Sequence, residues 1–322
     1  MASTATNLVI TLVTAVLQIL LLLLAAPLVN GVIKKVKARW QCRRGPGILQ
    51  MYYDLWKYLR KDEVVSEHAS WLYRCYPWVT FAAILTAGLL IPLVTTRLPL
   101  GFGGDLLVVI GLFALIRFFT ALAGLEAASA FGGMGSSREM ALSTVIEPAM
   151  MLGFFVIALE AQSTNLGQIV ESLAKAGLGA ISPAYLLTFI ALMVVVVAET
   201  GRVPLDNPDT HLELTMVHEG MLLEYSGRSL GLMFWGAAIK QLLVLSLLAN
   251  IFFPWGVPAT WAPLEILVAL PVFLLKVLAL GAMLACIETA FAKMRLFKVP
   301  ELLGASLMLS LMALISLFVV RN

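Results

Sequence analysis

A dense group of ionisable side chains lies between residues 199 and 228 of this 322-residue chain. It holds six carboxylates, two arginines and two histidines: Glu199, Asp206, Asp209, Glu213, Glu219, Glu224, Arg202, Arg228, His211 and His218. Closely spaced carboxylates repel one another, which raises the pKa of some of them towards neutral pH and lets them bind and release protons. The residue types and their spacing therefore favour proton or ion movement.

Further charged residues stand inside long apolar runs of the chain: Glu147, Lys240, Lys276 and Glu288. An unpaired charge in hydrocarbon is costly, so these side chains should face other helices, water or one another. A polar path for ions and a set of static ion pairs both meet that requirement. Arg117 lies in a similar run, and we expect it to form a structural pair with an acid such as Glu126.

The histidines and cysteines do not indicate a metal site. His218 and Glu219 begin like the H-E-x-x-H motif of zinc metalloproteases, but Leu222 stands where the second histidine is needed. The three cysteines are far apart in the sequence: Cys42, Cys75 and Cys286. Because they include no C-x-x-C pair, we expect no iron–sulfur or zinc site within this chain.

Apolar helices must position the charged groups. Hydrophobic residues make up 61% of the chain and charged residues only 13%, far from the composition of a soluble domain. Apolar runs of about 17–25 residues, the length that a spanning helix needs, occupy residues 8–29, 77–96, 105–123, 141–161, 183–199, 229–253, 264–288 and 302–320. The sequence therefore predicts an all-α polytopic membrane protein with eight transmembrane helices in a single membrane domain, residues 1–322.

The basic residues predict the orientation of these helices, because cytoplasmic loops carry the excess of lysine and arginine. Most of them fall in alternate loops, and only Arg97, Lys175 and Arg321 lie on the other side of the predicted spans. We therefore expect both termini on the non-cytoplasmic side, and the basic loop 31–76 and the acidic loop 199–228 on the cytoplasmic side. The net charge of +3 is small and indicates no nucleic-acid partner.

Two loops have further features of their own. In the basic loop, apolar residues at helical spacing from Ile48 to Leu59 predict an amphipathic helix on the membrane surface or on a partner. Segment 131–139 is rich in glycine but lacks the preceding strand and the Lys-Ser/Thr of a phosphate-binding loop. We expect a close-packed loop there, with Ser136 or Ser137 capping the next helix.

Three segments together resemble a known family. They are Arg43–Gly47 (RRGPG), Glu199–Asp206 (ETGRVPLD) and Glu224–Gly227 (EYSG). They resemble the membrane protein that lies next to the quinone site in respiratory complex I, with its E-T-N-R-x-P-F-D and E-Y-S-G patterns. Arg138 and Glu147 are similar to an arginine and a membrane glutamate of that family. The most similar branch is the hydrogenase-4 component C and formate hydrogenlyase subunit 4 group, whose R-R-G-P-G-x-x-Q-x-Y-x-D pattern matches residues 43–54.

The resemblance implies a membrane-arm subunit, non-catalytic by itself, of an oxidoreductase complex in a prokaryotic cytoplasmic (inner) membrane. Its partners would be NiFe-hydrogenase-like large and small subunits, iron–sulfur subunits and antiporter-like membrane subunits. The NiFe centre and iron–sulfur clusters would lie in those partners, and this chain would hold no cofactor. The expected proton or ion path comprises Glu147, Glu199, Arg202, Asp206, Asp209, Glu213, Glu219, Glu224, Lys240, Lys276 and Glu288. The expected docking residues are Arg43, Arg44, Gly45, Pro46, Gly47, Arg138 and Glu139.

Two alternatives stay open at this point. One is a quinone-reacting subunit of complex I. The chain departs from that pattern at His211, where an acid is usual, and at residues 214–223, which separate Glu213 from Glu224 by more than in complex I. The other alternative is a stand-alone transporter, which would show repeated halves or paired broken helices; neither is visible in the sequence.

Overall fold

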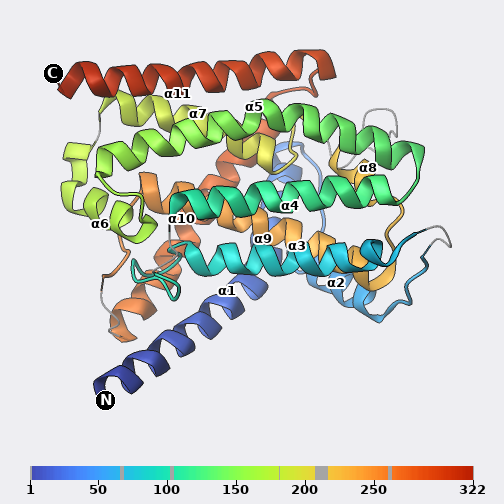
Figure 1. Cartoon of the computed structure of the whole chain (residues 1–322), viewed down its shortest axis with the longest axis horizontal. Helices are drawn as coiled ribbons and strands as arrows, with labels where there is room; N and C mark the ends of the chain where they lie inside the picture. Colours follow the sequence, from blue (N-terminus) through green and yellow to red (C-terminus); the bar gives the residue numbers. More distant parts are fainter. Residues whose placement is uncertain are drawn as a thin grey trace.

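The computed structural model describes residues 2–65, 69–101, 105–180, 182–206, 217–259 and 263–321, and these ranges form α-helices joined by short connections (Figure 1). The helices are α1 Ala2–Trp40, α2 Gln50–Arg60, α3 Trp71–Leu90, α4 Leu106–Glu126, α5 Ala130–Ala161, α6 Leu166–Ala176, α7 Pro183–Glu199, α8 His218–Leu222, α9 Gly227–Phe252, α10 Pro263–Ala290 and α11 Val299–Arg321. Within the described ranges the only β-type pairing is an isolated bridge between Asp105 and Asn165. The all-α prediction is confirmed.

Each of the eight predicted apolar runs coincides largely with a helix. In the described part of the chain, six helices are long and apolar enough to cross a membrane: α1, α4, α5, α9, α10 and the helix that ends the chain, α11. Helix α7 is equally apolar but has only 17 residues. Helix α3 has 20 residues and carries Arg74 in its first turn.

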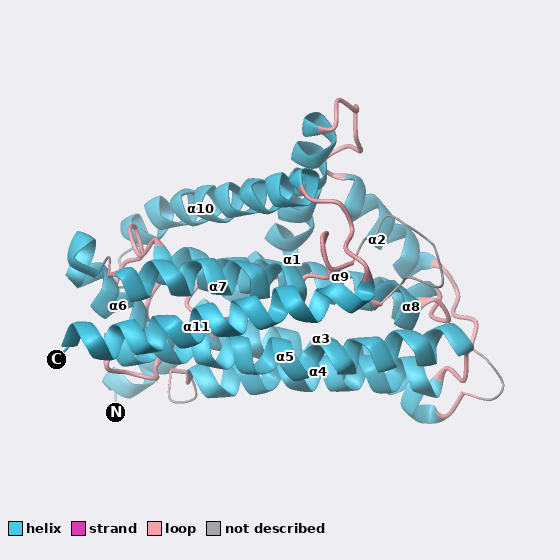
Figure 2. Cartoon of the chain, turned by 90° about the horizontal axis from the view of Figure 1, so that it is seen from above, coloured by secondary structure: helices cyan, strands magenta, loops and turns pink. Residues whose placement is uncertain are grey.

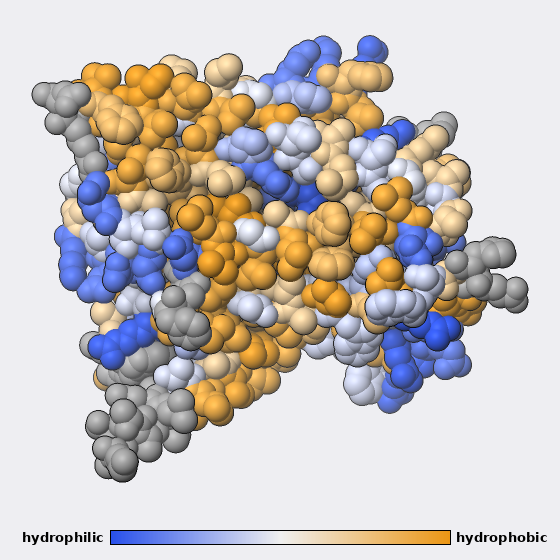
Figure 3. Space-filling model, viewed as in Figure 1, coloured by the Kyte–Doolittle hydropathy of each residue, from blue (hydrophilic) through white to orange (hydrophobic). Residues whose placement is uncertain are grey.

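Helices α3, α4, α5 and α11 lie roughly along the longest axis of the molecule, whereas α1 and α10 run obliquely to it (Figure 1). Helix α1 begins and α11 ends at the left-hand end, beside α6, whereas α2 and α8 lie at the right-hand end. Turned by 90°, α10 lies on the opposite side of the bundle from α4 and α5 (Figure 2). Hydrophobic side chains occupy much of the middle of the surface, and hydrophilic side chains gather chiefly towards the two ends (Figure 3). This distribution is what a helical bundle across a bilayer requires.

Helix α9 is the centre of the bundle. It packs against α1, α2, α3, α7 and α10, and of the six candidate spans it is the most buried. Its apolar residues extend around the whole helix, which is typical of a helix surrounded by protein. Polar side chains on α9 are therefore enclosed and must find partners on neighbouring helices.

Segment 131–139 is helical. The expectation of a loop there, with Ser136 or Ser137 capping the helix that follows, is therefore wrong. Helix α5 begins at Ala130, and the side chain of Ser129 caps it by accepting a hydrogen bond from the backbone N–H of Gly132. The small residues are explained by close packing, since a Cβ at Gly135 would lie 2.9 Å from the carbonyl oxygen of Val217. Helix α5 can therefore approach the segment that leads into α8.

The amphipathic helix of the basic loop is confirmed as α2. It buries Leu55 and packs against α9 and α1. Trp56 points outward and is 59% exposed, with the guanidinium of Arg60 4.6 Å from the ring centroid. A second amphipathic helix, α6, was not predicted; it follows α5 and buries one apolar face against the bundle.

Candidate functional site

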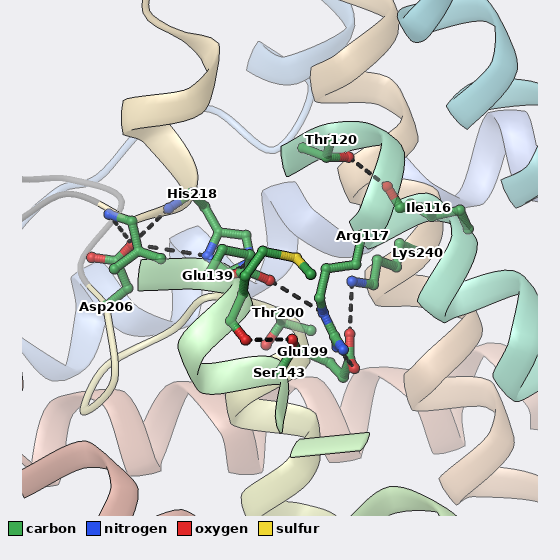
Figure 4. Close-up of polar contacts among 12 residues, drawn as sticks. Ile116, Arg117, Thr120, Glu139, Ser143, Glu199, Thr200, Asp206, His218 and Lys240 are labelled. Carbon is green, nitrogen blue, oxygen red and sulfur yellow. Dashed lines mark hydrogen bonds and ion pairs between the residues drawn. The ribbon is translucent and has the colours of Figure 1, made fainter. Parts of the chain in front are cut away.

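Arg117 is the centre of a buried group of charges. Its guanidinium extends from α4 towards three glutamates on two other helices, of which Glu139 and Glu199 are labelled in Figure 4. Nη1 lies 2.6 Å from Glu147 Oε1, Nε lies 3.2 Å from Glu139 Oε1, and Nη2 donates to Glu199 Oε1. An arginine can satisfy several carboxylates at once because its five N–H groups spread in a plane.

The expected pair between Arg117 and Glu126 is wrong. The two residues are nine apart on α4, which places them about 14 Å apart along the helix and on opposite faces. Glu126 instead accepts a hydrogen bond from the backbone N–H of Ser70 at 3.3 Å. Arg117 is paired by residues distant in the sequence, which spacing along one helix does not reveal.

Lys240 completes this group from the central helix. Its Nζ lies 2.7 Å from Glu199 Oε2, so Glu199 is held between a lysine and an arginine. The side chain of Glu199 is fully buried at the end of α7, and that of Lys240 is 13% exposed. Neighbouring cations of this kind favour the charged form of a buried carboxylate and offset its desolvation.

A second group lies beside the first and is centred on Arg202. Its Nη1 donates to Glu288 Oε1 at 2.9 Å, and its Nη2 donates to Gln241 Oε1 at 2.9 Å. Lys37, on α1, lies 3.1 Å from the other oxygen of Glu288. The two groups are adjacent because Gln241 follows Lys240 on α9, and Arg202 comes three residues after Glu199.

A third group ties the acidic loop to the bundle. Asp206 Oδ2 accepts hydrogen bonds from the backbone N–H groups of Val217 and His218, each at 3.2 Å. Asp206 Oδ1 lies 3.2 Å from Lys293 Nζ, between α10 and α11. The His218 side chain lies between Asp206 and Glu139 and so connects this group to the Arg117 group (Figure 4).

A cavity of about 600 Å³ adjoins the three groups. Exposed residues form one part of its wall, Lys34, Gly47 and Gln50 among them, and buried Arg117 and Glu199 form another. Its walls come from α1, α2, α3, α4, α5, α7, α8 and α9 and from the loops beside them. The cavity thus runs from the end of the molecule that bears α2 and α8 to the buried charges.

The structure brings most of the predicted path residues together. Glu147, Glu199, Arg202, Asp206, Lys240 and Glu288 belong to the three groups, and Glu219 lines the cavity. Glu224 is exposed and does not line the cavity. Asp209, Glu213 and His211 lie outside the described residues.

Lys276 lies apart from the other charged residues of the predicted path. Its Nζ lies 2.9 Å from Asn250 Oδ1, 2.9 Å from the carbonyl oxygen of Phe253 and 3.0 Å from that of Trp255. These acceptors belong to the far end of α9 and the turn after it. A lysine in this position satisfies carbonyl groups that the end of a helix leaves without partners.

The Glu224–Gly227 segment (EYSG) makes structural contacts with Val64 and Tyr73 and is not part of the charged groups. The Tyr225 ring stacks on Tyr73 with centroids 4.2 Å apart, and its hydroxyl donates to the Tyr73 carbonyl oxygen at 3.2 Å. The Ser226 hydroxyl accepts from the Val64 N–H and donates to the Val64 carbonyl oxygen. Burial raises the pKa of Tyr225, so the phenol keeps its proton and its hydrogen bond throughout the neutral pH range.

The expected docking residues lie in different surroundings. Arg43 and Arg44 are exposed at the end that bears α2, while Pro46 and Gly47 line the cavity. Arg138 is half-buried on α5. Glu139 is buried in the Arg117 group, where it contributes to the charge network.

Sequence reasoning missed the central role of Arg117 and the parts played by Glu139 and His218. One signal was available: Glu139, Ser143 and Glu147 are spaced by four residues, which places them on one face of a helix. That face needs a cation opposite it, and Arg117 lies in the adjacent apolar run. The contributions of Lys37 and Lys293 have no comparable signal, because their partners are far away in the sequence.

Comparisons with known proteins identify the family. The family model described as NADH dehydrogenase matches residues 12–320. Formate hydrogenlyase subunit 4 of Escherichia coli (strain K12) is 36% identical over 301 residues, covering 94% of this chain and 97% of the relative. Hydrogenase-4 component C of the same organism is 38% identical over 298 residues, covering 91% and 92%.

The fold also matches a solved structure. A chain of the membrane-bound sulfane sulfur reductase, an archaeal respiratory membrane complex, superposes with a TM-score of 0.85 over 95% of this chain and 99% of that chain. The two sequences are 21% identical, so this similarity establishes the fold alone. The family match over almost the whole length, together with the two bacterial relatives, shows that the chain belongs to the NADH dehydrogenase family of complex I-like membrane proteins.

Proposed function

We propose that this chain is the membrane-arm subunit of a hydrogenase-type respiratory complex and that its buried charges pass protons or other ions. It would cross a prokaryotic cytoplasmic membrane eight times, with both termini on the non-cytoplasmic side. The observation that carries the proposal is Arg117, which holds three glutamates beside a cavity reaching the end that bears α2 and α8. A buried charge network is costly to assemble, and in membrane proteins such networks characteristically lie on ion pathways.

The end that bears α2 and α8 fits a docking surface for a hydrophilic redox arm. Exposed Arg43, Arg44, Tyr53 and Trp56 lie there, beside the entrance of the cavity. Aromatic residues and arginines are the residue types enriched at protein interfaces. The two bacterial relatives are named as a subunit and a component, which supports a multi-subunit assembly. We assign the NiFe centre and iron–sulfur clusters of that assembly to its hydrophilic arm.

Glu147 supports a second partner within the membrane. It lies midway along α5, and its side chain is 36% exposed although it pairs with Arg117. A carboxylate that faces hydrocarbon at this depth is costly. A neighbouring membrane subunit covering this face would remove that cost and would offer the ion a sideways route. An antiporter-like subunit fits this role.

The first test replaces Glu199 with glutamine in the assembled complex. Glutamine keeps the shape of the side chain and removes the charge that Arg117 and Lys240 share, so we expect coupled turnover to fall at least about tenfold. Redox-driven ion uptake would be measured in proteoliposomes. Hydrogenase activity with a viologen dye would report on the redox arm directly, and we expect that activity to be unchanged.

The matched control is Glu171→Gln, which alters an exposed carboxylate paired with Lys175 at 2.7 Å on α6. It should leave both activities as they are. Full coupled turnover in an assembled Glu199→Gln complex would contradict the proposed function. The related variant Arg202→Ala should also impair coupling, because Arg202 holds Glu288 beside the first group.

A quinone-binding role is the second candidate, and the cavity favours it. Apolar Met51, Leu55, Leu232 and Phe234 share its wall with the charged residues, and about 600 Å³ lies within the range of small-molecule sites, roughly 300–1,000 Å³. On this alternative, solvent extraction of the purified complex should release bound quinone, and quinone-site inhibitors should block turnover. Absence of both effects would exclude it.

A further inference from the structure

His218 occupies the gap between the acidic loop and the Arg117 group. Its Nε2 lies 3.6 Å from Glu139 Oε2, and its Nδ1 lies 4.0 Å from Asp206 Oδ2. Both separations are within the range of ion pairs and slightly longer than hydrogen bonds. One ring nitrogen thus faces a carboxylate of each group, and a small rotation of the side chain brings either one into hydrogen-bond distance.

The two carboxylates are buried, whereas the histidine is not. The side chains of Glu139 and Asp206 are 5% and 6% exposed, while that of His218 is 34% exposed and lines the cavity. Glu139 Oε2 and His218 Nδ1 are enclosed and have no hydrogen-bond partner among the residues that the structure describes. Glu139, Asp206 and His218 all line the cavity, and the imidazole is the most exposed of the three side chains.

In each carboxylate, the oxygen that does not face His218 lies beside a cation. Arg117 contacts the other oxygen of Glu139, and Lys293 contacts the other oxygen of Asp206. Glu219, which follows His218 on α8, also lines the cavity. These are the charged groups of α4, α5, α8 and the α10–α11 connection that surround the imidazole. Each carboxylate therefore has one oxygen beside a cation and the other facing the histidine.

Gly201 makes room for the ring. Its φ of +59° is in the left-handed region, which favours glycine. A Cβ at this position would lie 3.0 Å from His218 Nδ1 and 3.1 Å from Cγ. The turn after α7 therefore leaves the space that the imidazole occupies, and a side chain larger than hydrogen would displace it.

We infer that His218 transfers protons between Asp206 and Glu139, and so joins the Asp206 group to the Arg117 group. This inference rests on the proposed function. In each transfer Nδ1 receives a proton from the carboxylic form of Asp206, which gives an imidazolium. Nε2 then releases its proton to the Glu139 carboxylate, and the ring is neutral again with its proton on Nδ1. Nε2 next takes a proton from cavity water, and Nδ1 returns its proton to the Asp206 carboxylate, which restores the starting tautomer and the carboxylic form of Asp206. Histidine suits this role because its charge changes near neutral pH.

The test uses His218→Ala and His218→Gln in the complete complex, reconstituted in proteoliposomes. We expect coupled turnover to fall at least about tenfold in both variants, while viologen activity of the redox arm stays unchanged. Added imidazole should restore turnover in His218→Ala, because the cavity of about 600 Å³ admits a molecule of that size.

Three controls make the result decisive. Imidazole should not rescue Glu199→Gln, whose defect lies deeper in the network. Gly201→Ala should reduce turnover by displacing the ring, and combining it with His218→Ala should bring no further loss. If His218→Ala fails to assemble, Gly201→Ala alone tests the inference. Normal coupling in His218→Gln, or a loss that imidazole does not rescue in His218→Ala, would overturn the inference. If Glu199→Gln alone is impaired, the proposed function survives without the histidine step.

Discussion

Replacing Arg117 with methionine is expected to destabilise the folded chain by about 3–5 kcal/mol, since it leaves buried carboxylates without their shared cation. Glu139 and Glu147 lose their only ion pair with an arginine or lysine among the described contacts, and Glu199 keeps Lys240 alone. Methionine has a similar length and is apolar, so the effect is one of charge rather than of packing. Thermal unfolding of the detergent-purified protein, together with the yield of assembled complex, measures the loss.

The controls for Arg117→Met come from the same chain. Lys175→Met removes a cation from an exposed pair on α6, whose side chains are 75% and 41% exposed, and should change stability little. Combining Arg117→Met with Glu139→Gln and Glu147→Gln should recover part of the stability, because the uncompensated charges are removed as well. If Arg117→Met were as stable as Lys175→Met, the central role of Arg117 would be wrong.

Gly31→Ala should displace the basic turn, residues 43–48, from helix α1. A Cβ on Gly31 would overlap the carbonyl oxygen of Ile48 and lie 3.0 Å from its carbonyl carbon. The obstacle is backbone, which cannot rotate away, so overpacking should cost about 1–3 kcal/mol. Because Ile48 lies two residues before the start of α2, that helix should shift at the cavity wall. Retention of the redox arm during purification should fall, and the unfolding free energy should decrease.

Gly111→Ala is the matched control for this change. Gly111 also lies in a long helix, α4, but no described heavy atom lies within 4 Å of its added Cβ. The variant should be unchanged or slightly more stable, since alanine favours a helix by roughly 0.5–1 kcal/mol over glycine. Equal behaviour of Gly31→Ala and Gly111→Ala would contradict the close contact between α1 and the basic turn.

Much of the fold follows from the sequence because hydrocarbon imposes a simple requirement. Backbone groups inside a bilayer must be satisfied within a helix, so long apolar runs predicted the helices, and α2 was predicted by its amphipathic spacing. The start of α5 was misjudged because glycine usually weakens a helix. In this chain Gly135 instead permits close contact with the segment before α8, a tertiary effect that no local pattern contains.

The site was only partly predictable because contacts between helices are not visible in the sequence. Acid clusters and isolated membrane charges are visible in the sequence, and Glu147, Glu199 and Lys240 were found that way. Their pairing depends on how α4, α5, α7 and α9 lie side by side, which the sequence alone does not contain. Arg117 was therefore assigned to a neighbour on its own helix, and Lys276 was grouped with charges that lie far from it.

Consecutive residues on α9 hold two different groups of charges: Lys240 contacts Glu199, and Gln241 contacts Arg202. Lys240 and Gln241 are neighbours on one helix, so a shift of α9 at this point moves the partner of Glu199 and the partner of Arg202 together. The first two groups of charges are therefore linked through the backbone of the central helix.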